Sequence, residues 1–482
     1  MKISDIIRRE EHIISEVDDN LEFNRLTDKA SELTGKDILI IPNGKRVPLQ
    51  NEYRSAPLAV ICDSEAEIPR GIPAIRVANA RLAYSRAFYR YEGLGSSTLK
   101  IIGVTGTNGK TTTATLIKRV LSKCGYRVGF IGTGAIESGE KQLNESNYSM
   151  TTPDPPLLYR SIRQMREDGC NAIVMEVSSH SLALDKVEPL SFDYGIFTNL
   201  SAEHLDFHRD MENYFAAKMG LLSRCKSAVI NIDDAYGRRA QEICKGKTIS
   251  TGILWRGNIW ADNIDNRGFD GMEYTYHGDG FSFRMKLPLA GEYNCYNSML
   301  AAAVCIDMGC PPCLVKKAIG ESDAVKGRYQ IIKDRISVII DYAHTSAAFD
   351  AILRELSRLK GVNNLTVVFG CGGDRDRAKR PRMAETAEKY ADRIIITADN
   401  SRTENTKSII SDIIGGFRNG SYEIKENRRD AIYSAIIGAS DGDIVAIIGK
   451  GPERYNIDKD GYHYFNEKEI AIEALKLRGG VK

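Results

Sequence analysis

The 482-residue sequence lacks any long hydrophobic run. No apolar segment approaches the roughly 20 residues that a helix needs to cross a bilayer. The first residues, MKISDIIRREEHII, contain no apolar core of the length seen in secretory signal peptides. These two absences argue against a membrane-spanning or secreted protein, and we expect the chain to be cytoplasmic.

An excess of charge of one sign is also absent. The sequence has 66 Lys and Arg against 64 Asp and Glu, a formal net charge of +2. This balance gives no global reason to expect nucleic acid or an anionic membrane as a partner. We therefore expect small-molecule partners and no nucleic acid or membrane. Separately, we expect a monomer. The length itself predicts about three domains of roughly 150 residues each.

Cysteine pairs with the spacing of a zinc site are missing as well. The ten cysteines are scattered, and Cys310 and Cys313, in the segment CPPC, have no second pair at a zinc-ligand interval. In a reducing compartment such cysteines are free thiols. We therefore predict a structural role for the CPPC segment.

Short β-branched segments alternate with helical stretches from residue 98 onward. The first series is KIIGV, YRVGFIG, AIVMEV, DYGIFT and SAVINI, and the second, from near residue 330, is ISVIID, LTVVFG, RIIIT and DIVAIIG. Such strands, apolar on both faces, are typical of a parallel sheet between two helix layers. Between the two series, residues 255–290 are rich in Gly and aromatic residues with alternating polarity, which predicts an antiparallel hairpin insertion.

These patterns predict an α/β protein with three domains. Residues 1–97 contain the short apolar runs DILIIP and LAVIC and form a small α/β domain, with a linker at LGSSTL, 94–99. Residues 98–329 form a central parallel-sheet domain. Residues 330–482 form a C-terminal α/β domain.

The strongest motif is GVTGTNGKTTT, between the strand KIIGV and the helix TATLIKRVLSKCG. Small residues let backbone N–H groups surround phosphates, and the N-terminus of the following helix attracts negative charge. We expect Lys110 to neutralise the outer phosphates and Thr111 to hold a magnesium ion. The strict spacing G-x-x-x-x-G-K-[ST] is not met, because Val104 stands where its first glycine belongs.

Acidic and histidine side chains follow two further predicted strands. Glu176 closes the strand AIVMEV and therefore lies at the carboxyl edge of the sheet, where open α/β sheets bind ligands. With Thr111 it can complete a magnesium site. His204 and His208 follow the strand DYGIF four residues apart, but without the HExxH order of zinc enzymes. We expect His204 to be a second magnesium ligand and His208 to be a satisfied polar residue.

Lys218 lies in an apolar helical stretch, FAAKMGLL. Its side chain either snorkels from a core helix towards solvent or is a modified, functional lysine. The residues alone leave both interpretations open.

Taken together, these segments resemble the Mur ligase family, and within it the MurE branch. The resemblance runs from about residue 98 to the C-terminus through TGTNGKTT, TTPDP, EVSSH, FTNLSAEHLDFH, AAKMGLL, GEYNCYN, GRY, DYAHT, FGCGGDRDRAKRPRM, DNSRTEN and GKGPERY. It implies an N-terminal domain that binds a uridine nucleotide, a central P-loop ATPase-like domain and a C-terminal Rossmann-like domain. It also implies a ligase that uses ATP and Mg²⁺ to form an amide bond through an acyl phosphate. Enzymes of this branch add a diamino acid to UDP-N-acetylmuramoyl-L-alanyl-D-glutamate in peptidoglycan synthesis.

The resemblance assigns roles to the matching residues. It implies ATP binding by Gly106, Thr107, Asn108, Gly109, Lys110, Thr111, Thr112, Asn294, Asn297, Arg328, Asp341, Tyr342 and His344. It makes Lys110, Glu176, His204 and Lys218 catalytic, and makes Thr111, Glu176, His204 and Lys218 metal ligands, the last as a carbamylated lysine. The acceptor acid would contact Thr151, Thr152, Ser178 and Lys186.

The residues matching the family's amino-acid site are Arg375, Asn400, Arg402, Gly449 and Glu453. In relatives that use meso-diaminopimelate, the arginine of a DNPR motif binds the distal carboxylate; this sequence reads DNSR, which keeps Arg402 and loses the proline. A guanidinium binds a carboxylate through two hydrogen bonds. This favours meso-diaminopimelate, with Glu453 receiving its distal ammonium group.

Other motifs depart from the family pattern. The uridine-binding motif DSR aligns with Asp28, Lys29 and Ala30, the arginine after EVSSH is Lys186, and GKGHE reads GKGPE. We therefore expect intact ATP handling, while recognition of the UDP-sugar stays open. Two alternatives remain: a paralogue that joins a different acid to a different amine, and a nucleotide-binding regulator without catalysis.

Overall fold

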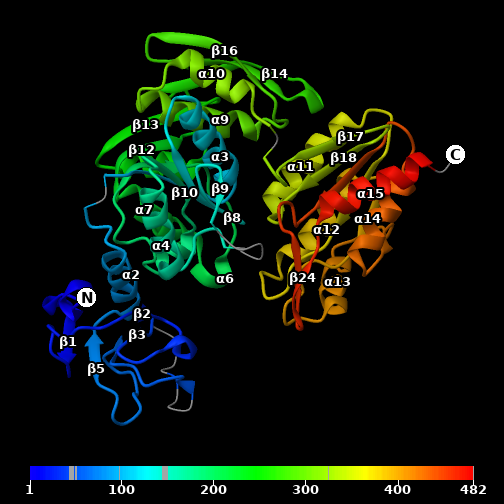
Figure 1. Cartoon of the computed structure of the whole chain (residues 1–482). Coiled ribbons are helices and arrows are strands. Elements are labelled where there is room, and N and C mark those ends of the chain that lie inside the picture. Colours follow the sequence, from blue (N-terminus) through cyan, green and yellow to red (C-terminus); the bar gives the residue numbers. More distant parts are fainter. Residues whose placement is uncertain (43–47, 49–51, 97, 144–149, 324, 481–482) are drawn as a thin grey trace.

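The computed structural model describes residues 1–42, 48, 52–96, 98–143, 150–323 and 325–480. It confirms the predicted α/β architecture of three domains, each built on its own sheet (Figure 1). Figure 1 shows the N-terminal domain attached to one end of the central domain, with the C-terminal domain alongside. Within the described ranges no helix is long and apolar enough to cross a bilayer.

The N-terminal domain contains a five-stranded sheet in the order β1-β5-β4-β3-β2. The runs DILIIP and LAVIC form the adjacent parallel strands β3 and β4. The predicted linker at 94–99 includes residue 97, which lies outside the described residues. The elements of this domain are α1 (Ile3–Ile6), β1 (His12–Ser15), β2 (Leu26–Thr27), β3 (Ile38–Ile40), β4 (Ala59–Asp63), β5 (Ala74–Val77) and α2 (Ala80–Tyr91).

The central domain is built on an eleven-stranded sheet in the order β16-β15-β14-β13-β12-β11-β6-β10-β7-β8-β9. Its strands are β6 (Lys100–Thr105), β7 (Val128–Gly132), β8 (Ala135–Ser138), β9 (Lys141–Gln142), β10 (Ala172–Glu176), β11 (Phe192–Phe197), β12 (Cys225–Asn231), β13 (Lys247–Gly252), β14 (Ile259–Asn266), β15 (Met272–Gly278) and β16 (Phe281–Leu287). Its helices are α3 (Lys110–Lys123), α4 (Pro155–Glu167), α5 (Ser179–Ala183), α6 (Leu205–His208), α7 (Met211–Leu222), α8 (Ala235–Ile243), α9 (Tyr293–Asp307) and α10 (Pro312–Gly320).

Strand β6 lies in the middle of this sheet, and β10 and β11 are its parallel neighbours. Glu176 pairs with Val104 in register, and Phe197 pairs with Thr105. The segments that follow the three strands therefore meet at one edge, where the phosphate loop leaves β6. This topology brings together motifs that are up to about a hundred residues apart in the sequence.

The central strands are buried on both faces, as predicted for a parallel sheet. Along β10, Ile173 and Met175 enter the core that α4 shares with the N-terminal domain, whereas Ala172 and Val174 enter the core under α3 and α9. Successive side chains of a strand point to opposite faces. Both faces thus need apolar residues, which explains the continuous runs in the sequence.

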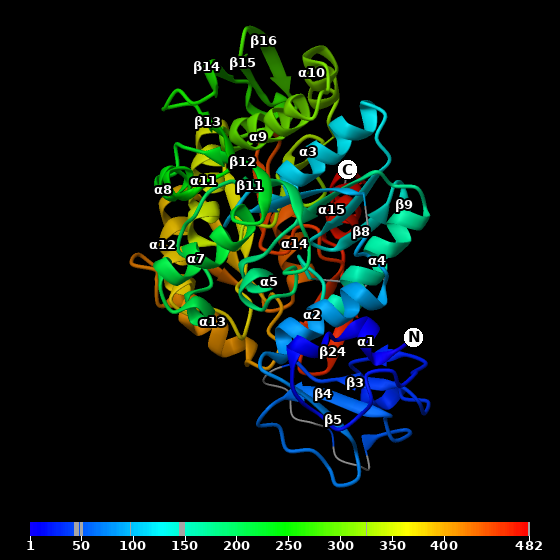
Figure 2. The same ribbon diagram turned by 90° about the vertical axis from the view of Figure 1, so that its left-hand side faces the viewer.

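The prediction for residues 255–290 was right about the antiparallel pairing and wrong about an insertion. Strands β14, β15 and β16 form an antiparallel meander, but β14 also pairs in parallel with β13. The meander therefore extends the central sheet. It lies at the end of the central domain far from the N-terminal domain (Figure 1 and Figure 2).

The C-terminal domain has a six-stranded sheet in the order β17-β18-β22-β19-β20-β21, with only β17 antiparallel among these strands. Its strands are β17 (Gln330–Lys333), β18 (Ser337–Asp341), β19 (Leu365–Phe369), β20 (Arg393–Ile396), β21 (Glu423–Ile424) and β22 (Ile444–Ile448), and a separate hairpin consists of β23 (Tyr455–Asp458) and β24 (Gly461–Tyr464). The helices are α11 (Ser346–Leu359), α12 (Lys379–Tyr390), α13 (Thr406–Ile414), α14 (Arg428–Ile437) and α15 (Glu467–Gly480).

The turn between β14 and β15 contacts the C-terminal domain. Phe269 packs against the C-terminal core, the Asn266 amide donates to Glu355 Oε1 at 2.7 Å, and Lys333 Nζ donates to Asp270 Oδ1 at 2.9 Å. This contact and the chain connection hold the two domains beside each other. They thereby set the cleft between the two sheets.

Candidate active site

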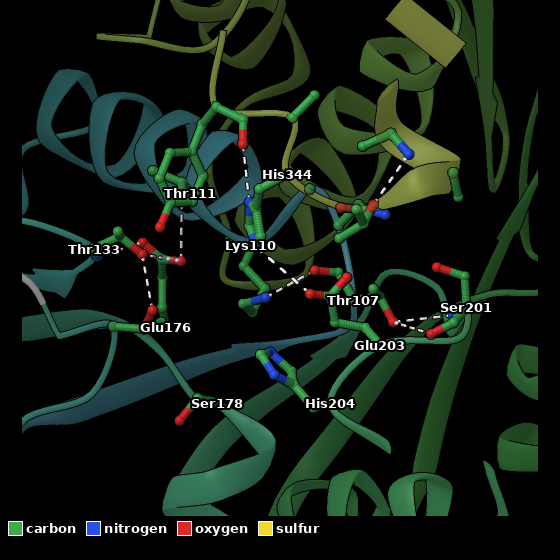
Figure 3. Close-up of a pocket in the computed structure, with 18 of the residues that line it drawn as sticks. Thr107, Lys110, Thr111, Thr133, Glu176, Ser178, Ser201, Glu203, His204 and His344 are labelled. Carbon is green, nitrogen blue, oxygen red and sulfur yellow. Dashed lines mark hydrogen bonds and ion pairs between the residues drawn. The ribbon is translucent and has the colours of Figure 1, made fainter. Parts of the chain in front are cut away.

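A cavity of about 730 Å³ lies between the central and C-terminal domains, at the carboxyl edges of their parallel sheets. It is lined by every residue that the sequence analysis assigned to a site except Gly106, whose carbonyl accepts hydrogen bonds from two lining lysines. The residues expected for ATP, for the acid and for the amino acid thus surround one space. Figure 3 shows the side chains around the phosphate loop.

The phosphate loop occupies residues 106–109, between β6 and α3. Gly106 and Gly109 have φ angles of +144° and +85°. A Cβ at Gly106 would lie 1.8 Å from Thr198 Oγ1, and one at Gly109 would lie 2.3 Å from Asn297 Oδ1. Both positions require glycine, because of the backbone angles and because other segments approach so closely.

The segment after β11 holds this loop in place. Thr198 Oγ1 donates to the Asn108 carbonyl at 2.6 Å, and the Asn199 carbonyl accepts from the Thr107 N–H at 2.9 Å. The first turn of α3 then lines the cavity. The N–H groups of a first helical turn have no partner within the helix and attract phosphate.

Two lysines converge behind the loop. Lys110 Nζ and Lys218 Nζ donate to the Gly106 carbonyl at 3.0 and 2.8 Å. Lys218 is 1% exposed and lines the cavity, so the snorkelling interpretation is wrong. Burial and the neighbouring charge of Lys110 hold the pKa of Lys218 well below its usual range. Burial therefore favours the uncharged form of the amine.

Glu176 is a buried carboxylate at the end of β10. Its Oε2 accepts from Thr111 Oγ1 at 3.0 Å and its Oε1 accepts from the Thr133 N–H at 2.8 Å (Figure 3). Among protein cations, Lys110 interacts with this carboxylate electrostatically. A buried carboxylate oxygen that lines the cavity suits a bound metal ion.

His204 precedes α6 in the left-handed conformation, with φ +56°. Burial, and then the charge of His180, lower the pKa of His204 to about 2, which leaves a neutral imidazole with a nitrogen lone pair. The Nε2 atom of His208 lies 2.9 Å from Ser179 Oγ, within hydrogen-bonding distance. The prediction that His208 is a satisfied polar residue is therefore confirmed. His204 is the N-cap residue of α6 and His208 is its last residue.

The asparagines and the arginine that were expected near ATP lie on the opposite side of the loop. Asn297 Nδ2 donates to Asn294 Oδ1 at 2.9 Å, at the start of α9. Arg328 Nη2 donates to Thr111 Oγ1 at 3.1 Å, and its guanidinium stacks 4.3 Å from the Tyr342 ring centre. Arg328 therefore reaches from the segment between the domains to the first turn of α3.

The segment after β18 supplies the rest of this wall. Asp341 accepts from the backbone N–H groups of Tyr329 and Ala343 at 2.5 and 2.6 Å. Burial, and then the charge of Lys379, lower the pKa of His344 to about 3. His344 is therefore neutral in the absence of ligands.

The residues expected for the acceptor acid lie beside Glu176. Thr152 Oγ1 donates to the Glu176 carbonyl at 2.9 Å, and Thr151 Oγ1 lies 3.0 Å from Thr133 Oγ1. Ser178 caps α5. Lys186 Nζ pairs with Asp154 at 2.6 Å, so an intramolecular contact engages this cation.

The residues expected for the amino acid follow β19, β20 and β22. Arg402 has φ +52°, and its Nη1 donates to the carbonyls of Gly373 and Asn400 at 2.8 and 3.2 Å. The Asn400 amide donates to Glu453 Oε2 at 2.7 Å. Gly449 has φ +124° and lines the same side of the cavity. Arg375 also lines the cavity and lies in the exposed segment after β19.

Several further lining residues were not assigned from the sequence, among them Glu203, Thr133 and Asn199. Glu203 Oε1 lies 3.9 Å from His344 Nε2 and 4.0 Å from Lys379 Nζ, so it faces the C-terminal domain across the cavity. Glu203 directly precedes His204 in the sequence, and this position could have identified it as a site residue. Thr133 and Asn199 carry no local signal, because their roles depend on β10 and on the phosphate loop.

The comparisons with known proteins agree with this geometry. Residues 104–305 match the Mur ligase middle domain, and residues 327–451 match the family described as "Mur ligase, glutamate ligase domain". The chain is 34% identical over 487 residues to the UDP-N-acetylmuramoyl-L-alanyl-D-glutamate--2,6-diaminopimelate ligase of Clostridium tetani, with 99% of each chain covered. It is 39% identical over 429 residues to the ligase of the same name from Aquifex aeolicus, which covers 88% of this chain and 86% of that one.

Solved structures give the same result. A structure of a UDP-N-acetylmuramoyl-L-alanyl-D-glutamate--2,6-diaminopimelate ligase superposes with a TM-score of 0.66 at 26% identity, over 100% of both chains. The folylpolyglutamate synthase of Mycobacterium tuberculosis, complexed with ADP and AMPPCP, has a TM-score of 0.65 at 18% identity and covers 77% of this chain and 92% of that one, which shows a shared fold. On sequence identity, coverage and fold, this chain belongs to the Mur ligase family of ATP-dependent ligases.

Proposed function

We propose that this protein joins meso-diaminopimelate to UDP-N-acetylmuramoyl-L-alanyl-D-glutamate, with ATP consumed to activate the acceptor carboxylate as an acyl phosphate. The single observation that carries the proposal is the shared cavity, with the phosphate loop at one end and Arg402 with Glu453 at the other. The names of the relatives supply the acid and the amine. We place the reaction in the cytoplasm, where ATP is available.

The three domains would divide the substrates among them. In this proposal residues 1–97 bind the UDP-sugar, residues 98–329 bind ATP and residues 330–482 bind the amino acid. The placement of the phosphate loop in the central sheet and of Arg402 in the C-terminal sheet supports this division.

ATP would lie with its phosphates against the loop 106–109 and the first turn of α3. Lys110 and Arg328 would neutralise the phosphates, and the remaining loop residues Thr107, Asn108, Gly109, Thr111 and Thr112 would line them. Asn294 and Asn297 would lie near the adenine. Asp341, Tyr342 and His344 would line the ribose side.

Thr111, Glu176, His204 and the carbamate of Lys218 are the proposed magnesium ligands. In the described residues no group of three or more His, Cys, Asp or Glu is arranged to hold a metal by itself. Mg²⁺ is commonly held by one or two protein ligands together with phosphate oxygens and waters, so this donor set fits. When bound, the ion neutralises the charge that develops on the phosphate oxygens.

Lys218 is suited to carbamylation because burial lowers the pKa of its amine and so favours the uncharged, nucleophilic form. Its nitrogen attacks CO₂, a C–N bond forms, and the amine loses one proton to give a carbamate. The product places a negative charge near His204, on a side chain that lines the cavity. Both the lowered pKa and the cavity-facing position support the modification.

Residues of this chain would position the substrates for two successive steps. In the first, the acid lies against Thr151, Thr152 and Ser178 while Lys110 holds the γ-phosphate that its carboxylate attacks. In the second, the amine, held by Arg402 and Glu453, attacks the acyl carbon and phosphate leaves. The C-terminal domain excludes water, which would otherwise hydrolyse the acyl phosphate.

A second candidate is a ligase with a different acceptor acid. The uridine motif is replaced by Asp28, Lys29 and Ala30, and Tyr84 donates to Asp28 Oδ2 at 2.7 Å, so that carboxylate already has an internal partner. Lys186 is likewise paired with Asp154. These contacts favour an altered acceptor pocket while leaving the ATP side unchanged.

Phosphate release tests the two candidates. We expect release only when ATP, UDP-N-acetylmuramoyl-L-alanyl-D-glutamate and an amine are all present, with meso-diaminopimelate preferred over lysine and ornithine. Failure to bind this acceptor at millimolar concentration, measured by calorimetry, would remove the first candidate. ATP hydrolysis without either co-substrate would argue against both.

A further inference from the structure

Lys450 is a fully buried cation directly behind the wall of the proposed amino-acid site. It follows Gly449 at the end of β22, is 0% exposed and does not line the cavity. Isolated buried charges are costly, so a buried lysine is expected to have a defined set of partners. Its partners are residues that do line the cavity.

Three oxygen atoms surround the Lys450 ammonium group. Nζ donates to Asn400 Oδ1 at 2.6 Å and lies 3.5 Å from both Asp399 Oδ1 and Glu453 Oε2. The backbone N–H of Ile457 also donates to Asn400 Oδ1, at 3.0 Å. Lys450 therefore joins the segment after β20 to the segment after β22.

These contacts fix the orientation of the Asn400 amide. An ammonium group and a backbone N–H can only donate, so the amide oxygen must face Lys450 and Ile457. The amide nitrogen is then directed at Glu453 Oε2, 2.7 Å away. Glu453 Oε1 is left with a long contact, 3.4 Å, to the Tyr342 hydroxyl.

The charges around this group fit a substrate that carries both a carboxylate and an ammonium group. Asp399 and Glu453 are two carboxylates beside the single ammonium of Lys450, and Arg428 is paired with Glu467 at 2.7 Å. Arg402 also acts on both carboxylates, and with it the charges of the group balance. A substrate that brings a carboxylate to Arg402 and an ammonium group to Glu453 Oε1 keeps this balance.

We propose that Lys450 is a positioning residue for the amine substrate: it holds the Asn400 amide and the Glu453 carboxylate in the orientation that receives an ammonium group. The inference rests on the proposed function, because it needs a cationic amine in this part of the cavity. Lys450 itself does not contact the substrate.

Electrostatics support the same role. Burial raises the pKa of Glu453, the charge of Lys450 opposes this shift, Asp399 adds to it and Arg402 opposes it. The other titratable or charged groups described near this cluster are Tyr342, Arg428, Tyr455 and Glu467. Removing the Lys450 charge therefore raises the pKa of Glu453, so its carboxylate takes up a proton at a higher pH.

The test compares Lys450→Met with Lys450→Gln, which keeps a hydrogen-bond donor and removes the charge. We expect the KM for meso-diaminopimelate to rise at least about 30-fold in Lys450→Met, with the KM for ATP within about twofold. In both variants the acidic limb of kcat/KM for the amino acid should move to higher pH. Combining Lys450→Met with Glu453→Gln should cost much less than the sum of the two single effects, because one acts through the other.

Lys360→Met is the matched control. It breaks an ion pair with Asp392, 2.6 Å, near the opposite edge of the same sheet, so it reports the general cost of losing a lysine in this domain. An unchanged KM for the amino acid in folded Lys450→Met, an equal rise in the KM for ATP, or an acidic limb that stays in place in both variants would overturn the inference. A wild-type enzyme that uses no amine overturns the proposed function instead.

Discussion

Replacing Arg402 with alanine tests the proposed choice of amino acid. Nη1 of Arg402 is engaged by two carbonyls, at 2.8 and 3.2 Å, which leaves Nε and Nη2 to bind a carboxylate side-on. A charge-assisted pair of this kind contributes about 3 kcal/mol, so its loss should raise the KM for meso-diaminopimelate about 150-fold. Alanine and arginine are similarly strained at φ +52°, so the backbone cost of the substitution is small.

The assay is phosphate release with each amine at saturating ATP and acceptor. Lysine lacks the distal carboxylate, so its KM should change by no more than about threefold if Arg402 contacts only that group. Arg402→Lys is the matched control, because it keeps the charge but loses the planar guanidinium. Its KM for meso-diaminopimelate should lie between those of the wild type and Arg402→Ala. Equal increases in KM for meso-diaminopimelate, lysine and ATP would refute the assigned role.

Three further predictions concern the loop, the buried lysine and the domain contact. Gly106→Ala should abolish ATP binding, measured by calorimetry, because its Cβ would lie 1.8 Å from Thr198 Oγ1; normal affinity would contradict the loop geometry. Labelled bicarbonate should give a carbamate carbon signal by NMR that Lys218→Ala removes together with activity, and a signal unaffected by the substitution would exclude carbamylation at Lys218. Phe269→Ala should lower the melting temperature of the C-terminal domain by several degrees, because a partly buried aromatic leaves its core; an unchanged melting profile would show that the contact contributes little.

The fold was largely predictable from the sequence because buried parallel strands leave a strong local pattern. All nine β-branched runs of the two series form strands of the central and C-terminal sheets. The meander 255–290 was only partly predicted. Its alternating polarity indicates antiparallel pairing, but nothing local shows that β14 also pairs with β13.

The site was predictable where a motif carries its own chemistry, and not where function depends on a tertiary contact. The phosphate loop and Glu176 follow from strand ends, which meet in any parallel sheet of this order. Lys218 could be interpreted in two ways until the helix α7 was placed with its lysine behind the loop. Lys450 belongs to the segment GKGPERY, but only packing shows that it is buried behind Asn400 and Glu453.

The central claim is that the acceptor carboxylate attacks the γ-phosphate of ATP in the cavity between the two sheets. It is tested most directly with UDP-N-acetylmuramoyl-L-alanyl-D-glutamate labelled with ¹⁸O in the terminal carboxylate, followed by mass analysis of the released phosphate. An acyl phosphate intermediate predicts one ¹⁸O atom in each phosphate formed, since the attacking oxygen leaves with the phosphoryl group. Phosphate that contains no ¹⁸O while the amide product accumulates would contradict the account.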